Sequence, residues 1–111
     1  MTNSLWPRGI ELRYVLTWQL FLHGTATVPE LIDALANHNF DLGERPSKAV
    51  SDALRWEMRY CRVFRLARGR YGPGWMPRGT EYRIHQRVLA LRDKAASLSL
   101  GGGQTDTHPP A

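Results

Sequence analysis

Apolar residues recur at helical spacing in four stretches of the chain. The first stretch, residues 10–23, has apolar side chains around much of its circumference, which predicts a central core helix ended by Gly24. A second helix is expected to begin after Thr27, because Thr27 and Glu30 have the spacing of a capping box, and to end near residues 37–39. Residues 25–27 between these helices read as a short extended link, with one small strand as an alternative.

The third predicted helix runs from Pro46 to about Tyr60, since proline is favoured at the first helical position. Val50, Leu54, Met58 and Cys61 share one face at helical spacing, so we expect Cys61 to be a buried, small apolar residue. Trp56 and Tyr60 lie on the same helix, and two interpretations remain open for them. Core packing is favoured, and stacking on nucleic-acid bases is the alternative.

An extended pattern follows the third helix. Residues 62–66 have strand composition, Gly69 suits the positive φ of a turn, and residues 71–72 return as a second strand. Thr80 is expected to cap a last helix that runs from Glu81 to about Leu98. This order predicts a mostly helical α+β fold, namely a winged helix-turn-helix of three helices and a two-stranded β-wing with an added C-terminal helix.

The same pattern divides the chain into four parts. Residues 1–9 are expected to be a leader and residues 10–76 the winged helix-turn-helix domain. Residues 77–98 form the C-terminal helix, and residues 99–111, rich in glycine and proline, are predicted to be a disordered tail.

The last helix carries an apolar stripe at alternating spacings of four and three residues, which is typical of a heptad seam. Two interpretations fit this stripe: pairing with a second protomer, which we favour, or packing onto residues 10–23 of the same chain. A homodimer would place two recognition helices about one DNA turn apart. The predicted dimerisation residues are Ile84, Val88, Leu91, Ala95 and Leu98.

Charge is distributed unevenly along the 111 residues, which have a net charge of +5. Residues 45–94 hold thirteen of the fifteen lysines and arginines against four acidic residues, whereas residues 1–44 hold two arginines against five acidic residues. Most of the cations are arginine, whose planar fork suits phosphate oxygens and guanine edges. Clustering of this kind favours a polyanionic partner over a basic surface kept only for solubility.

Residues 43–74, GERPSKAVSDALRWEMRYCRVFRLARGRYGPG, resemble the third helix and wing of small bacterial winged helix domains. They are similar to HARE-HTH domains, in which a proline-started helix precedes a strand and a short hairpin with glycine and an aromatic residue. They also resemble the N-terminal domains of abortive-infection antitoxins, whose wing has a similar pattern. The resemblance covers roughly residues 10–76 and implies that the third helix enters the major groove while the wing contacts phosphates or the minor groove.

The resemblance also implies which residues contact DNA. Arg55 is the best candidate for a guanine contact, and Ser47, Lys48 and Ser51 near the helix start suit phosphates or base edges. Asp52 is a candidate as well, with pairing to Arg55 or Arg59 as the alternative. The full set of predicted DNA-binding residues is Ser47, Lys48, Ser51, Asp52, Arg55, Arg59, Arg62, Arg65, Arg68 and Arg70.

Other function classes find little support in the sequence. The four histidines are scattered and there is one cysteine, so we expect no metal site and no disulfide within one chain. No phosphate loop, nucleophile elbow or dinucleotide fingerprint is present, so we expect neither an enzyme, nor a cofactor, nor a small-molecule substrate. No signal peptide or long apolar run is evident, which predicts a cytoplasmic protein without a membrane partner.

The leading hypothesis is a cytoplasmic, nucleoid-located protein that binds double-stranded DNA as a homodimer. It would act as a transcriptional regulator with a preferred site or as a nucleoid-associated protein that coats DNA with little preference. A winged-helix module that docks a protein partner and an RNA-binding module remain as alternatives.

Overall fold

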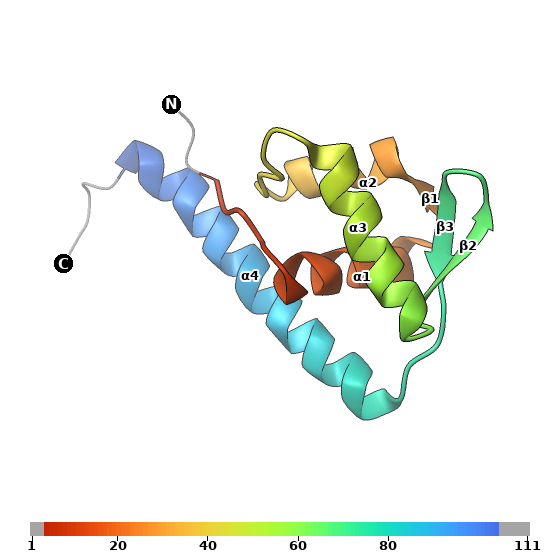
Figure 1. Ribbon diagram of the computed structural model, residues 1–111. Helices are drawn as coiled ribbons and strands as arrows, with labels where there is room; N and C mark the ends of the chain where they lie inside the picture. The colour runs from red at the N-terminus through yellow and green to blue at the C-terminus, as the bar shows by residue number, and fades with distance from the viewer. Residues whose placement is uncertain (1–3, 105–111) are drawn as a thin grey trace.

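The computed structural model describes residues 4–104, with side chains up to Ser99, and there it contains four helices and a three-stranded antiparallel sheet (Figure 1). The prediction of a mostly helical α+β fold is confirmed. In chain order the elements are α1 (Ile10–His23), β1 (Ala26–Thr27), α2 (Val28–Asn37), α3 (Pro46–Arg59), β2 (Val63–Ala67), β3 (Arg70–Pro73) and α4 (Arg78–Gln104).

Local sequence signals account for the starts and ends of the first two helices. Helix α1 has the predicted bounds, and the backbone N–H of Gly24, at φ 84°, closes it with a hydrogen bond to the carbonyl of Leu20. The capping box at α2 is present: the amide of Glu30 donates to Thr27 Oγ1 at 3.3 Å, and the amide of Thr27 donates to Glu30 Oε1 at 2.8 Å. Hydrogen bonds from the backbone and the side chain of Thr27 lower the pKa of the Glu30 carboxyl, and the backbone bond contributes most.

The sheet has one strand more than the two we predicted. Residues 26–27 form β1, which pairs antiparallel with β3 through Ala26 opposite Tyr71 and Thr27 opposite Arg70. The strand order is β1-β3-β2, so the short link between α1 and α2 occupies the edge of β3 that the hairpin leaves open. One small strand in this link was the alternative interpretation. The sequence could not decide for it, because a two-residue element has no periodicity of its own and its pairing depends on a partner more than 40 residues away.

Strands β2 and β3 form the predicted hairpin, with Gly69 at φ 73° in its turn. The hairpin register shifts between Arg65 and Ala67, where the pairing is irregular. Behind the hairpin, Gly74 lies against the corner that joins α3 to β2. A Cβ atom at Gly74 would lie 2.3 Å from the carbonyl oxygen of Cys61, so only glycine fits there.

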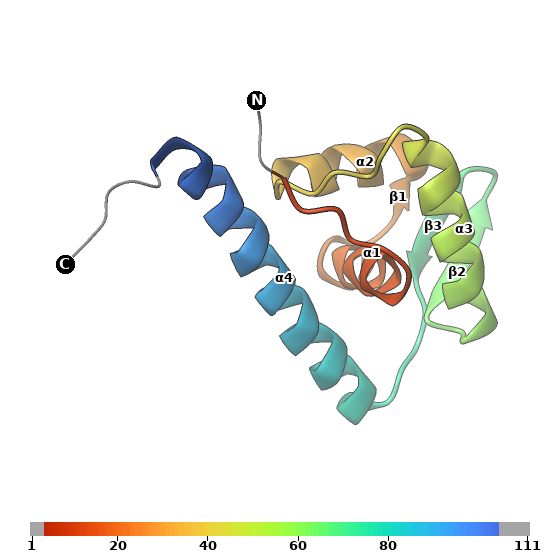
Figure 2. The same ribbon diagram turned by 60° about the vertical axis from the view of Figure 1, so that its left-hand side comes forward.

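Helix α1 lies at the centre of the molecule, as its apolar circumference predicted. Figure 2 shows it nearly end-on, with α4 on one side and α3 and the sheet on the other. The buried apolar residues come from every helix, from β2 and from the segments before α3 and α4, and they form one core: Leu12, Val15, Leu16, Trp18, Leu20, Leu31, Leu35, Phe40, Leu42, Val50, Ala53, Leu54, Val63, Met76, Ile84, Val88, Leu91 and Ala95.

The stripe on α4 belongs to this core. Ile84, Val88, Leu91 and Ala95 are buried within the single chain, and Leu98 is half-buried. The ring of Trp18 on α1 also stacks on the imidazole of His85, with 4.2 Å between centroids. The structure therefore uses the stripe for packing inside the chain, the interpretation that we did not favour. A homodimer through the same residues stays a prediction, and it would require α4 to leave its own core.

Both ends of the domain differ from expectation. Residues 4–9 pack onto the fold rather than forming a separate leader: the amide of Leu5 donates to the carbonyl of Asn39, and Pro7 is buried. Helix α4 begins before Thr80 and continues to Gln104, so it is longer than predicted at both ends. The helix can continue through the glycines after Leu100 because glycine in a helix costs only about 1 kcal/mol relative to alanine, and no proline, which would break the helix, occurs within α4. The rest of the predicted disordered tail, residues 105–111, lies outside the described residues.

Candidate nucleic-acid interface

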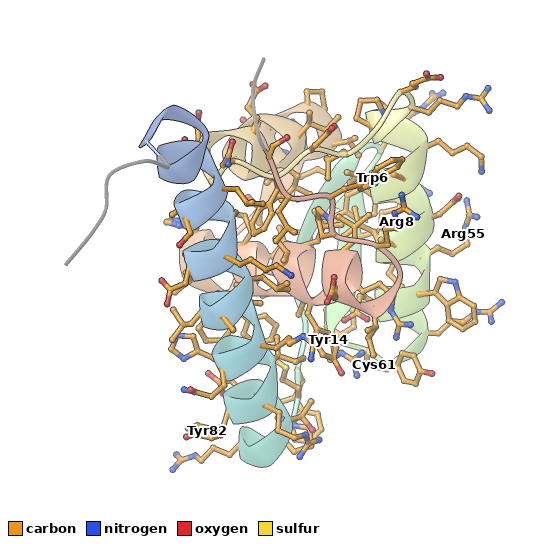
Figure 3. The ribbon with its side chains drawn as sticks, turned by 90° about the vertical axis from the view of Figure 1, so that its left-hand side faces the viewer. Trp6, Arg8, Tyr14, Arg55, Cys61 and Tyr82 are labelled. Carbon is orange, nitrogen blue, oxygen red and sulfur yellow. The ribbon has the colours of Figure 1, made fainter. Side chains whose placement is uncertain are left out.

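The outer side of α3 presents cations because its inner side is apolar. Val50 and Leu54 are fully buried, so Lys48, Arg55 and Arg59 point away from the core. Side-chain exposure is 61% for Lys48 and 68% for Arg55. Figure 3 shows Arg55 projecting from α3 into solvent. The structure thus confirms that Lys48, Arg55 and Arg59 are exposed on the outer side of α3.

Asp52 is held within this face by its own helix. Lys48 Nζ donates to Asp52 Oδ2 at 2.8 Å, and Arg55 Nη1 donates to Asp52 Oδ1 at 3.4 Å. The hydrogen bond from Lys48 is the main cause of the lowered pKa of Asp52. This pairing matches the alternative interpretation of Asp52, and because such exposed pairs are weak, Lys48 and Arg55 can exchange this carboxylate for a phosphate or base.

The hairpin adds a second group of exposed arginines. Arg65 on β2, Arg68 in the turn and Arg70 on β3 are all exposed. Arg70 Nη1 also donates to Thr25 Oγ1 at 3.5 Å, which directs Arg70 toward β1. Helix α3 and the hairpin lie side by side in both ribbon views (Figures 1 and 2). Two neighbouring elements therefore present cations to solvent.

Arg62 does not belong with these exposed cations. Its guanidinium grips Glu57 with two bonds, Nε to Oε1 and Nη2 to Oε2, both 2.8 Å long. Its side chain is only 14% exposed. We had placed Arg62 among the DNA-binding residues from its position in the sequence. The structure instead commits it to a buried carboxylate that sequence reasoning had not singled out.

Glu57 is the centre of a polar cluster between α1 and α3. It is fully buried, and besides Arg62 it accepts hydrogen bonds from Thr17 Oγ1 at 2.7 Å and from Arg13 Nε at 3.0 Å. Burial by itself would raise the pKa of Glu57. The hydrogen bonds from Arg62, Thr17 and Arg13 outweigh burial and lower the pKa. Glu57 therefore stays ionised and fixes both arginines.

Glu57 occupies the core-facing position that we had expected for its neighbours. Trp56 is 47% exposed and Tyr60 is 52% exposed, so the prediction of core packing for these rings is wrong. Cys61 is exposed as well, because α3 ends at Arg59 and Cys61 has φ 61°, which breaks the helical spacing that had placed it inward. Glu57 lies seven residues after Val50 and three after Leu54, so it shares their buried side, and Trp56 and Tyr60 are left exposed beside it.

Among residues 4–104 no cluster of three histidine, cysteine or acidic side chains could hold a metal ion. None of the described helices is both long and apolar enough to cross a membrane. The hollows along α3 are open ones. The largest, of about 750 Å³, lies at the turn before the helix. Its residues are Trp6, Asp41, Leu42, Gly43, Glu44, Arg45, Lys48, Ala49 and Asp52.

Comparison of the chain with protein-family models, with curated proteins and with solved structures finds no match.

Proposed function

We propose that this chain binds double-stranded DNA through a winged-helix arrangement. The outer side of α3 enters the major groove, and the β2–β3 hairpin contacts the phosphates or minor groove beside it. A major groove is wide enough for one helix, and Lys48, Arg55 and Arg59 on the exposed side of α3 carry the donors that phosphates and guanine edges accept.

The observation that carries this proposal is the exposure of cations on two adjacent elements. On α3 the apolar residues take the inner side, so the cations remain outside with at most one weakly held carboxylate between them. On the hairpin the arginines stand at and beside the turn. Since duplex DNA carries closely spaced phosphates, two neighbouring cationic elements match it better than one would. A transcriptional regulator or a nucleoid-associated protein would use this surface in the same way.

The first test is fluorescence anisotropy with a labelled random-sequence duplex at several salt concentrations. We expect affinity to fall with salt, because each phosphate neutralised adds about 0.9 to the slope of log affinity against log salt concentration. The double variant Arg68→Glu, Arg70→Glu should lose duplex binding and flatten this slope. The matched control is Arg78→Glu with Arg83→Glu on α4, which changes net charge equally and should retain more affinity than the hairpin variant.

Arg55→Ala separates base reading from phosphate contact. If Arg55 contacts a guanine, the variant loses about 1–3 kcal/mol on the preferred site and less on random DNA. Equal loss on all sequences would assign Arg55 to a phosphate. Absence of binding at low salt in the unaltered chain would refute the proposal and make docking of a protein partner the leading function.

A further inference from the structure

Two aromatic rings stand among arginines on the side of α3 that faces α1. We call this surface the aromatic–arginine flank: Trp56 and Tyr60 of α3, with Arg59 and Arg62 from the same region and Arg13 from α1. About half of each ring's residue surface is open to solvent. The flank shares Arg59 with the outer side of α3, but Trp56 and Tyr60 lie nearer to α1, where Arg13 approaches both rings.

Guanidinium groups hold the rings in place. Arg13 lies 5.4 Å from the centroid of each ring, Arg59 lies 4.9 Å from that of Trp56, and Arg62 lies 4.7 Å from that of Tyr60. These are cation–π distances. Since Glu57 anchors Arg13 and Arg62 from beneath, the rings are positioned before any ligand arrives.

Trp56 lines two open hollows. One hollow of about 380 Å³ lies toward α1 and is lined in part by Gly9, Arg13 and Trp56. Another of about 390 Å³ lies toward the outer side of α3, where Trp56 meets Arg55 and Arg59. The indole therefore borders two open hollows, each lined by Asp52 and by at least one arginine.

The charge of the flank favours a phosphate chain. Three guanidinium groups stand in the flank near two carboxylates. Glu57 is fully buried, and Asp52, which lines both hollows, is paired with Lys48 and Arg55. The open groove nearer Trp6 has a less favourable charge, since Asp41, Glu44 and Asp52 line it against Arg45 and Lys48. The flank combines two exposed rings with more guanidinium groups than exposed carboxylates.

We propose that the aromatic–arginine flank binds single-stranded nucleic acid. An unstacked base lies on the ring of Trp56 or Tyr60, and the exposed Arg59 contacts a neighbouring phosphate, while Arg13 stays bonded to Glu57 and positions the rings. A duplex cannot use these rings in the same way, because its base faces are already covered by neighbouring bases. The activity goes beyond duplex binding by the outer side of α3 and the hairpin, and it does not depend on that binding.

The experiment measures binding of labelled (dT)12 by anisotropy and by quenching of tryptophan fluorescence. Trp56→Leu should weaken (dT)12 binding by about 5-fold to 150-fold, the range for loss of one stacked base, and should abolish most of the quenching. Tyr60→Leu should weaken it within the same range. Trp56→Phe keeps a ring and should retain part of the affinity.

Trp75→Leu and Tyr82→Leu are the matched controls, since these residues are 68% and 64% exposed and lie outside the flank. Both should leave (dT)12 binding within about 2-fold of the unaltered chain, because surface changes elsewhere remove no stacking contact. Circular dichroism verifies that each variant is folded.

Three results would overturn the proposal: no binding of (dT)12 at low salt, equal losses in Trp56→Leu and Trp75→Leu, or a loss in Trp56→Leu that is as large for duplex as for (dT)12. The Arg68→Glu, Arg70→Glu variant separates the two proposals. It should lose duplex binding while (dT)12 still quenches tryptophan fluorescence. If the unaltered chain does not bind duplex at all, the duplex proposal fails and the (dT)12 measurement still tests the flank.

Discussion

Replacing Glu57 with glutamine removes the one carboxylate that joins α1, α3 and the start of the hairpin. Both of its oxygens accept hydrogen bonds: Oε1 from Thr17 and Arg62, and Oε2 from Arg13 and Arg62. A glutamine amide has an oxygen on one side only. Whichever way it turns, its NH2 group faces N–H donors and at least one guanidinium loses its acceptor.

The expected cost follows from burial. Removing one partner of a buried ion pair costs about 3–5 kcal/mol. Here the side chains of Arg13 and Arg62 keep 18% and 14% exposure, so water recovers part of this loss. We therefore expect a decrease of about 3 kcal/mol in the free energy of unfolding, against a total of about 5–15 kcal/mol for a domain of this kind. A loss of this size lowers Tm by roughly 12–24 °C.

The assay is urea and thermal unfolding followed by circular dichroism, with Glu44→Gln as the exposed control, which should stay within about 0.5 kcal/mol of the unaltered chain. The pH dependence adds a second check. Because the pKa of Glu57 is lowered on folding, its contribution is present above the ordinary glutamate pKa and is lost as pH falls through the lowered folded value. The difference between the unaltered chain and Glu57→Gln should therefore shrink in acid below the ordinary glutamate pKa.

A Glu57→Gln variant that loses less than about 1 kcal/mol, or a difference that does not change in acid, would refute the view that this ionised cluster stabilises the packing of α3 on α1.

Three further predictions concern single sites. Gly74→Ala should destabilise the domain by about 1–3 kcal/mol, because the added methyl meets the backbone of Cys61 and Arg62. Urea unfolding measures this loss, and an unchanged free energy of unfolding would contradict the close approach. Cys61 is exposed, so a thiol reagent should modify it fully in the native state, and protection until unfolding would show that it is buried after all. Val88→Glu should unfold the chain, because Val88 is fully buried within it. Circular dichroism and light scattering measure folding and oligomeric state. A dimeric unaltered chain together with a folded, monomeric variant would show that the α4 stripe is a dimer interface.

The sequence by itself determined the elements whose signals are local. The capping box placed the start of α2, a proline placed the start of α3, and Gly24 and Gly69 placed a helix end and a turn. The exposed cations of α3 were also predictable, since apolar residues at helical spacing define the inner side and leave Lys48, Arg55 and Arg59 outside.

Only the tertiary structure decided how the buried carboxylate at the end of α3 is compensated. A buried glutamate is stable only where arginines from other segments reach it, and sequence distance does not show that Arg13 and Glu57, 44 residues apart, meet. The bonds of Arg62 to Glu57 took Arg62 out of the exposed cations. The pairing of β1 with β3 and the packing of the α4 stripe on α1 likewise depend on partners distant in the chain. A helical stripe requires an apolar partner, but it does not specify whether that partner belongs to the same chain.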